Sequence, residues 1–125
     1  MNIQKTKIND LTLIQPDVFT DERGYFFESF QKERLRKLGI EAEFVQDNLS
    51  FSSKNVLRGV HAQNPGSQGK LVQVLQGAVW DVAVYIRCKS PDFGRWTAVE
   101  LSEGNKRQFY IPPGFAHGFC VLSDT

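Results

Sequence analysis

The run Trp80-Asp81-Val82-Ala83-Val84-Tyr85-Ile86-Arg87 decides the fold class of this chain. Side chains alternate between the two faces of a β-strand. The apolar residues at even positions therefore share one face, and Asp81, Ala83 and Tyr85 share the other. Both faces are at least partly apolar, which is typical of a strand in a two-layer sandwich with a filled interior. We predict a strand over Ala78–Arg87.

Similar short runs occupy most of the chain on both sides of this strand. Clusters of turn-forming residues, such as Ser52–Asn55 and Ser102–Asn105, separate them. The further strands that we expect are Leu11–Ile14, Tyr25–Phe30, Phe44–Phe51, Val56–Gln63, Lys70–Gln76, Trp96–Leu101, Gln108–Ile111 and Gly118–Leu122. A single helix is predicted over Gln31–Gly39, because Leu35 and Leu38 fall on one face and Gly39 is a common C-terminal stop. The pattern indicates an all-β antiparallel sandwich or barrel.

Length and composition exclude several classes of protein. A chain of 125 residues is expected to form one domain over residues 1–125. Its net charge of +1 argues against a nucleic-acid-binding protein. No apolar run approaches the ~20 residues that a membrane span requires, and the first residues lack the apolar centre of a signal peptide. We expect a cytoplasmic protein that binds neither nucleic acid nor membrane, with Cys88 and Cys120 reduced.

The stretch Leu57–Gln76 carries the most telling polar residues. His61 follows Arg58 by three positions, and a Gly- and Pro-containing loop then leads to Lys70. An imidazole is suited to proton transfer near neutral pH, and nearby cations stabilise a developing negative charge. This pattern predicts a proton-abstraction site. Strict alternation would place Arg58 and His61 on opposite faces, so we predict a bulge or kink near Gly59.

A second stretch points to a fold family. In Ile111–Phe119 the spacing Pro-x-Gly-x-x-His, ending at His117, is the second signature of the cupin double-stranded β-helix. The first cupin signature survives only in part, because His61-Ala62-Gln63 keeps only the first of its two histidines and Lys70 stands in place of its glutamate. Zinc and iron sites need three or four ligands, and the chain has two histidines. We therefore expect no metal and no cofactor.

Longer motifs extend the resemblance to one enzyme family. They run in the same order through nearly the whole chain: Pro16–Phe19, Asp21–Phe26, Phe44–Asn48, Leu57–His61, Gln68–Val72, Trp80–Val84, Ser90–Gly94, Ile111–Phe119 and Leu122–Thr125. In these motifs the chain resembles the dTDP-4-dehydrorhamnose 3,5-epimerases, cupin (jelly-roll) enzymes of dTDP-rhamnose biosynthesis. The resemblance implies an isomerase that acts on a dTDP-4-keto-6-deoxyhexose by removing protons next to the 4-keto group, at C3, at C5 or at both.

The resemblance also implies roles for individual residues. His61 matches the catalytic base, and Lys70 matches the residue that stabilises the enolate oxygen. The residues that match substrate contacts are Arg23, Glu28, Gln46, Asp47, Asn48, Arg58 and His117. We add Asp81 to the catalytic residues as our own inference, on the expectation that it orients Lys70 from an adjacent strand.

Structural alternatives remain open for several of these residues. His117 could be bonded to backbone at a strand end, and Arg23 could be a turn residue that pairs with Asp21. The polar triplet Gln46–Asn48 could be a solvated edge. Asp81 could equally play no part in the site.

The sequence departs from the family in two respects. Ala62 stands where the family usually has a tyrosine, which could change the sugar that fits. Family members also continue beyond the position of Thr125 with strands that carry a general-acid tyrosine and an aspartate paired with the catalytic histidine. We therefore expect the last strands of the family fold to be missing and the identity of the acid to be open.

Three functional alternatives follow, together with one expectation about assembly. The chain could be a weakened epimerase, an epimerase of a single carbon, or a nucleotide-sugar-binding cupin without activity; a metal-dependent cupin enzyme is a more distant alternative. The resemblance also implies a homodimer formed by strand exchange through the aromatic segment Tyr25–Phe30, with Arg23 reaching the neighbouring site.

Overall fold

The computed structural model describes residues 2–5, 11–41, 43–61, 69–86 and 94–123. These residues form ten strands and one helix, α1 (Lys32–Lys37). The strands are β1 (Asn2–Lys5), β2 (Thr12–Gln15), β3 (Val18–Asp21), β4 (Gly24–Phe27), β5 (Leu57–His61), β6 (Lys70–Gln73), β7 (Ala78–Tyr85), β8 (Trp96–Ser102), β9 (Gln108–Ile111) and β10 (Phe115–Val121).

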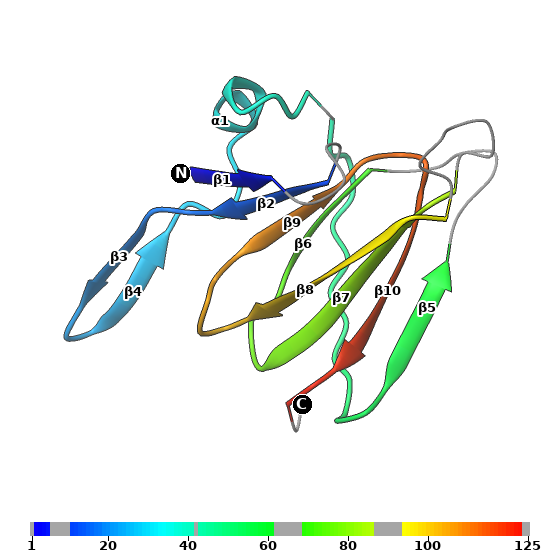
Figure 1. Ribbon diagram of the computed structural model, residues 1–125. Coiled ribbons are helices and arrows are strands. Elements are labelled where there is room, and N and C mark those ends of the chain that lie inside the picture. Colours follow the sequence, from blue (N-terminus) through cyan, green and yellow to red (C-terminus); the bar gives the residue numbers. More distant parts are fainter. Residues whose placement is uncertain (1, 6–10, 42, 62–68, 87–93, 124–125) are drawn as a thin grey trace.

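The strands form two four-stranded sheets and a hairpin. The first sheet has the order β1-β2-β9-β6, the second has the order β5-β10-β7-β8, and β3 pairs only with β4. Every ladder between them is antiparallel. Figure 1 shows the second sheet lying across the first, with the hairpin β3–β4 extending away from both. The predicted all-β sandwich with one short helix, of the cupin jelly-roll kind, is confirmed.

The interior between the two sheets is filled mainly by apolar side chains. Its buried cluster takes residues from both sheets: Leu11, Leu13, Ala83, Tyr85, Leu101, Phe109, Ile111 and Phe115. Along β7 the side chains of Asp81, Ala83 and Tyr85 are buried, whereas Trp80 on the opposite face is exposed. The alternation predicted for this strand is therefore observed, and its inward face contains one carboxylate.

Helix α1 covers the outer face of the first sheet. Leu35 of the helix packs with Ile14 and Ile40 in a second buried cluster, which Phe44 and Tyr110 border. The side chain of Gln31 caps the helix by accepting a hydrogen bond from the Arg34 backbone N–H. The helix ends before Gly39, whose φ of +93° suits glycine. The predicted helix is thus confirmed with slightly shorter bounds.

Strand β5 contains the predicted irregularity. In its pairing with β10, His61 lies opposite His117 and Arg58 lies opposite Phe119. Three steps along β5 thus match two steps along β10, which defines a β-bulge, and Gly59 has a φ of +93°. Because His117 and Phe119 share a face of β10, the bulge sets positions 58 and 61 opposite the same face.

Some expected elements differ from those observed. The expected strand Phe44–Phe51 belongs to no sheet of the described residues. It is a segment whose apolar residues Val45, Leu49 and Phe51 are exposed, whereas Phe44 is half-buried against the second cluster. The prediction is wrong because no second layer within the described part of the chain buries this apolar side. Strands β1 and β3 were not predicted, and β10 begins at Phe115 rather than Gly118.

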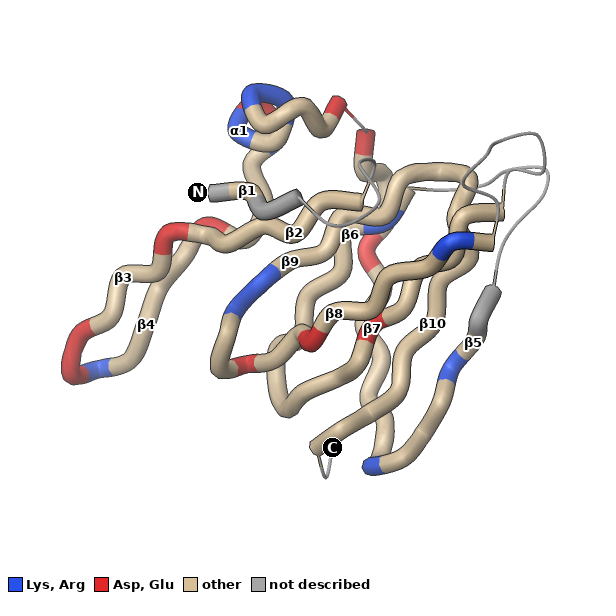
Figure 2. The backbone as a smooth tube through the Cα atoms, viewed as in Figure 1, with Lys and Arg blue, Asp and Glu red and all other residues tan. Residues whose placement is uncertain are grey.

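Charged residues lie mainly outside the sheets. Figure 2 shows them at the hairpin tip, on α1 and near strand ends, whereas most of the backbone of the two sheets carries neither sign of charge. Along the described backbone both signs of charge occur, in keeping with the net charge of +1. Within the described ranges, no helix is both long and apolar enough to cross a membrane.

Candidate active site

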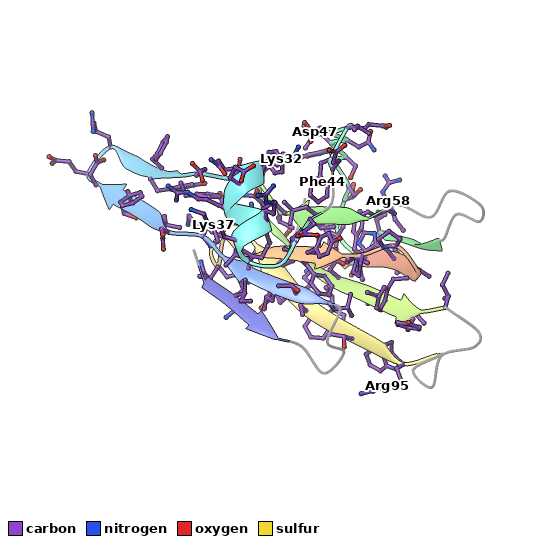
Figure 3. The ribbon with its side chains drawn as sticks, turned by 90° about the horizontal axis from the view of Figure 1, so that it is seen from above. Lys32, Lys37, Phe44, Asp47, Arg58 and Arg95 are labelled. Atoms are coloured by element: carbon purple, nitrogen blue, oxygen red, sulfur yellow. The ribbon has the colours of Figure 1, made fainter. Side chains whose placement is uncertain are left out.

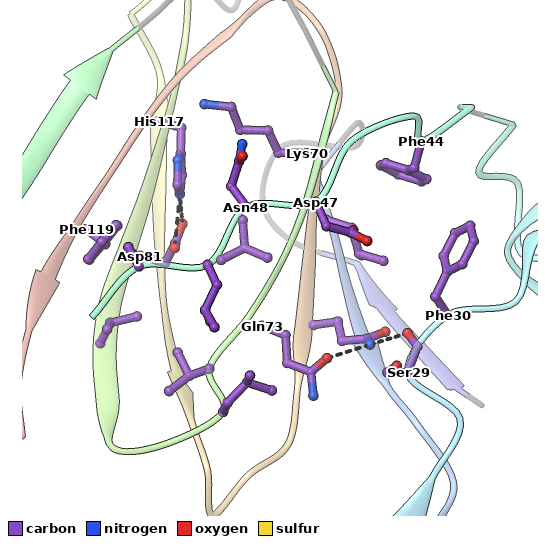
Figure 4. A pocket seen from close by; sticks show the side chains of 18 of the residues that line it. Ser29, Phe30, Phe44, Asp47, Asn48, Lys70, Gln73, Asp81, His117 and Phe119 are labelled. Atoms are coloured by element: carbon purple, nitrogen blue, oxygen red, sulfur yellow. Dashed lines mark hydrogen bonds and ion pairs between the residues drawn. The ribbon is translucent and has the colours of Figure 1, made fainter. Parts of the chain in front are cut away.

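A cavity of about 970 Å³ opens along the free edge of β6 and extends between the two sheets. The extended segment 44–52 runs over it and contributes to its lining. Lys70 of β6, Asp81 of β7 and His117 of β10 lie at one end of the cavity, as Figure 4 shows. The cavity therefore joins residues from both sheets and from the covering segment.

Asp81 and His117 form a close pair in this cavity. The Nε2 atom of His117 lies 2.8 Å and 3.0 Å from the two carboxylate oxygens of Asp81. The two residues are not direct register partners, because His117 lies opposite Ala83, two positions along β7 from Asp81 and on the same face. His117 thus bonds to a side-chain carboxylate rather than to backbone at a strand end.

The environment of the Asp81 carboxyl has opposing effects on its pKa. Burial raises the pKa of Asp81 above its ordinary value, because desolvation disfavours the charged form. The hydrogen bond from His117, the charge of His117 and the charge of Lys70 act in the opposite direction. The carboxyl is fully buried, so its stability as an anion depends on these two neighbours.

Lys70 approaches the pair from the other sheet. Strand β6 belongs to the first sheet and β7 to the second, so the expectation that Asp81 orients Lys70 from an adjacent strand is wrong about the arrangement. Because Asp81 lies on the buried face of β7, its carboxylate points into the interior between the sheets, where it is bonded to His117. Figure 4 shows the Lys70 side chain extending toward His117 and Asn48.

For the predicted base, His61, the structure describes the position of the backbone, which lies beside the site. Its Cα is the register partner of His117 in the ladder between β5 and β10. The side chain of His61 and the neighbouring Ala62 lie outside the described structure. The backbone thus brings the position of His61 next to the Asp81–His117 pair.

Arg58 lies at the rim and is held by a residue of the cavity lining. Its Nε donates a hydrogen bond of 2.8 Å to the hydroxyl oxygen of Ser52. Ser52 lines the cavity, whereas Arg58 is exposed. Figure 3 places Arg58 on the same side of the molecule as Phe44 and Asp47.

The polar triplet Gln46–Asn48 lines the cavity as well as facing solvent. The side-chain amide of Gln46 donates a hydrogen bond of 3.1 Å to Asn48 Oδ1. The triplet is therefore an exposed segment that also covers the cavity. The two interpretations of the sequence, a set of substrate contacts and a solvated edge, are compatible with each other.

Arg23 and Glu28 are not among the residues that line the cavity of their own chain, although Glu28 directly precedes Ser29, which does. Arg23 is at the tip of the hairpin β3–β4, 88% exposed, and forms an ion pair of 2.8 Å with Asp21. This pairing lowers the pKa of the Asp21 carboxyl. Glu28 forms an ion pair of 3.2 Å with Arg34 of α1. Within one chain, Arg23 and Glu28 therefore do not lie in the cavity lining with the other predicted site residues.

Sequence reasoning missed a buried amide network at the other end of the cavity. The Nε2 atom of Gln108 donates to the carbonyl of Ser29 at 2.5 Å and to Gln73 Oε1 at 3.2 Å. All three residues line the cavity. Gln108 and Gln73 are register partners in β9 and β6, but their types and spacing carry no signal that would have singled them out.

Two kinds of group are not found in the cavity. None of the three tyrosines of the chain lines it: Tyr25 lies on the hairpin, Tyr85 packs edge-on against Phe115, and burial raises the pKa of Tyr110 beside Phe44. Within the described ranges no three His, Cys, Asp or Glu side chains gather as a metal site would require. The residues present are suited to acid–base and hydrogen-bonding chemistry.

The fold and this cavity define a class: a cupin-type β-sandwich with a cavity in its interior that polar side chains help to line. Within that class, the chain belongs to the dTDP-4-dehydrorhamnose 3,5-epimerase family, whose model it matches over residues 5–125. It is 59% identical to the dTDP-4-dehydrorhamnose 3,5-epimerase of Shigella flexneri, over 99% of this chain and 70% of that protein.

Solved structures agree with this assignment. The Legionella pneumophila dTDP-6-deoxy-D-glucose-3,5-epimerase, solved with dTDP-4-keto-L-rhamnose, superimposes with a TM-score of 0.96 at 59% identity, over 98% of this chain and 66% of that chain. A 3′-monoepimerase from Streptomyces bikiniensis, solved with dTDP-quinovose, gives a TM-score of 0.87 at 30% identity, over 96% of this chain and 62% of that one. The chain spans about two thirds of the length of such relatives.

Proposed function

We propose that this protein is an epimerase of a dTDP-4-keto-6-deoxyhexose and removes a proton next to the 4-keto group, at C3, at C5 or at both. The observation that carries the proposal is the meeting of Lys70 and the Asp81–His117 pair at one end of the cavity, beside the β5 position of His61. Family membership supports the choice of substrate. We propose a cytoplasmic location too, as expected from the sequence.

The chemistry divides between two residues in this proposal. His61 takes the proton from the carbon, and the electron pair of the broken C–H bond moves into an enolate whose negative charge lies on the 4-oxygen. The ammonium group of Lys70 stabilises that oxygen by charge and hydrogen bonding. Water on the opposite face of the carbon donates a proton to it as the enolate collapses to the ketone, and His61 releases the proton that it took to solvent, so that the configuration is inverted and the base is restored. A positioned general base typically contributes ~10²–10⁴-fold to the rate.

Substrate binding is assigned to the exposed side of the cavity. Gln46, Asp47 and Asn48 lie in the segment that covers it, and we propose that they contact the nucleotide sugar. Arg58 is proposed to bind the diphosphate, because a guanidinium can donate two parallel hydrogen bonds to a phosphate group. His117 is proposed to contact the sugar.

A homodimer would complete the site. The hairpin β3–β4 extends from the sandwich and exposes the aromatic residues Phe19, Tyr25 and Phe26. We propose that it adds to the sheet of a second copy by strand exchange. Arg23 at its tip, together with Glu28, would then contact the substrate in the neighbouring site, in keeping with the absence of both from the lining of their own chain's cavity.

Proton exchange in D₂O tests this function. The protein is incubated with dTDP-4-keto-6-deoxyglucose, and the signals at C3 and C5 are followed by NMR. Deuterium should enter at one or both carbons, and His61→Ala should abolish exchange while the nucleotide sugar still binds. Exchange at C3 alone would identify a single-carbon epimerase, as the name of the Streptomyces bikiniensis relative describes.

Two other outcomes would replace the proposal. Tight binding of the nucleotide sugar without exchange at either carbon would identify a nucleotide-sugar-binding cupin. Stoichiometric iron, nickel or zinc that depends on His61 and His117, together with loss of activity on chelation, would identify a metal-dependent cupin enzyme.

A further inference from the structure

Asp81 is a fully buried carboxylate in an interior that is otherwise mainly apolar. The inward-facing residues that flank it on β7 are Val79 and Ala83. Burying an ionisable group in such surroundings is costly unless it is paired. His117 supplies the partner, and its side chain is itself only 12% exposed. An apolar residue would fill position 81 at lower cost, so the pair calls for a reason other than packing.

The geometry of the pair fixes which nitrogen of His117 is engaged. Both oxygens of Asp81 lie within 3.0 Å of Nε2. An ionised carboxylate can only accept hydrogen bonds, so Nε2 must carry the hydrogen. In the neutral ring the second nitrogen, Nδ1, then has a free lone pair and can accept a hydrogen bond.

We propose that Asp81 is a positioning residue that holds His117 in its Nε2–H form, so that Nδ1 accepts a hydrogen bond from a hydroxyl group of the bound sugar. The inference rests on the proposed function and deepens it. Lys70 from β6 lies at the same end of the cavity, and Asp47 of the covering segment also lines it. At this end of the cavity, Lys70 would thus donate to the keto oxygen of the sugar, and Nδ1 of the neutral His117 would accept a hydrogen bond from a sugar hydroxyl.

The hydrogen bond to His117 would contribute to binding of the sugar part of the ligand and not to binding of its nucleotide part. A site built to pair with a hydroxyl rejects a ligand that lacks it, because a buried polar group is left unpaired. Removing His117, or releasing it from Asp81, should therefore weaken binding of the nucleotide sugar and leave binding of the nucleotide unchanged.

The tautomer of His117 can be measured directly by long-range ¹H–¹⁵N NMR on the ¹⁵N-labelled protein. The signals of the two histidines are assigned with His61→Asn and His117→Gln. We expect the wild-type protein to show His117 as the Nε2–H tautomer. In Asp81→Asn the side-chain amide can donate to Nε2, so a measurable fraction should change to the Nδ1–H form. A wild-type Nδ1–H tautomer, or a tautomer insensitive to Asp81→Asn, would overturn the proposal.

Calorimetric titration with two ligands tests the consequence for binding. With dTDP-quinovose, a stable 6-deoxyhexose nucleotide, Asp81→Asn and His117→Gln should each weaken binding about 3- to 10-fold, as expected for one hydrogen bond. The double variant should lose no more than His117→Gln alone, because both changes remove the same contact. With dTDP, neither change should alter affinity. Additive losses, or equal losses for dTDP, would contradict the proposal.

His117→Gln also guards against a failure to fold. Its amide nitrogen can donate to Asp81 in place of Nε2, so the buried carboxylate keeps a partner and the variant remains testable if Asp81→Asn unfolds. Failure of the proposed function and failure of the role of Asp81 give different results in these experiments. If dTDP-quinovose does not bind the wild-type protein, the proposed function fails, whereas the NMR experiment still decides the role of Asp81.

Discussion

Ser52 accepts a hydrogen bond from Arg58 Nε at 2.8 Å, and this contact fixes the plane of the Arg58 guanidinium at the rim of the cavity. A guanidinium has five N–H donors, one on Nε and two on each Nη. With Nε directed at Ser52, the Nη groups are the donors that can meet a phosphate. Ser52 therefore prepares Arg58 for its proposed role without contacting the ligand itself.

We expect Ser52→Ala to weaken dTDP binding about 3- to 10-fold, because Arg58 must then be ordered when the ligand binds. Ser53→Ala is the matched control, since Ser53 is an exposed neighbour whose backbone carbonyl accepts from Val56. Calorimetric titration measures both variants. Equal affinities for Ser52→Ala and the wild-type protein would show that Arg58 does not depend on this contact.

The bulge in β5 leads to a prediction about stability. Gly59 has a φ of +93°, a conformation that costs a residue with a Cβ roughly 1–2 kcal/mol. Gly59→Ala should therefore lower the free energy of unfolding by about that amount, as measured by urea denaturation. It should also reduce proton exchange, because the bulge sets the positions of Arg58 and His61.

Gly104→Ala provides the control for this prediction. A Cβ at Gly104 would make only an ordinary contact, 3.7 Å from Ser102 Oγ. Its free energy of unfolding should differ from that of the wild-type protein by less than about 0.5 kcal/mol. An equal loss of stability in the two variants would argue against a special role for the backbone at Gly59.

The buried carboxyl of Asp81 predicts a pH dependence of stability. Burial raises the pKa of Asp81 above its ordinary value of 3.8, so the folded protein binds this proton more tightly than the unfolded chain does. The stabilising contribution of the proton is complete below pH 3.8 and is lost as the pH rises through the raised pKa of the folded state.

Urea denaturation at a series of pH values measures this effect against Asp81→Asn. The free energy of unfolding of the wild-type protein, relative to the variant, should fall as the pH rises above about 3.8 and level off beyond the raised pKa. A relative gain in wild-type stability over the same interval would mean that pairing with His117 and Lys70 outweighs desolvation.

The exposed hairpin predicts a dimer that depends on its aromatic residues. Phe19 and Phe26 are register partners on β3 and β4 and are 67% and 71% exposed. Phe26→Ser should shift the protein from dimer toward monomer in analytical ultracentrifugation. Trp96→Ser changes a comparably exposed residue on β8 and should leave the dimer intact. Dissociation by Trp96→Ser alone would place the interface on the second sheet.

Much of the fold could be predicted from local patterns. The alternation in β7 and the helix ending before Gly39 follow from short-range rules, and both are observed. The bulge at Gly59 was predicted because one site required Arg58 and His61 to serve together. The segment 44–52 was misread as a strand, since its aromatic and branched residues suit a strand. Nothing local reveals that no strand in the described part of the chain pairs with it.

The candidate site was predictable in its residue types but not in its pairings. The sequence indicated His117, Lys70 and Asp81, yet it linked Asp81 to Lys70. Which strands face each other across the sandwich depends on long-range topology, and that topology places β6 and β7 in different sheets. The contact Gln108–Gln73 was missed because it depends on the long-range pairing of β6 with β9. The contact Ser52–Arg58 spans only six residues, but the residue types alone carry no signal for it.

The most direct test of the central claim is proton exchange by Lys70→Met with dTDP-4-keto-6-deoxyglucose in D₂O. The claim is that Lys70 stabilises the enolate at the end of the cavity where β6 faces the Asp81–His117 pair. One donor to a developing oxyanion contributes roughly 2.7–4 kcal/mol, or about 10²–10³ in rate. We predict a loss of exchange of that size with binding of the nucleotide sugar retained. Wild-type exchange rates in Lys70→Met would contradict the account.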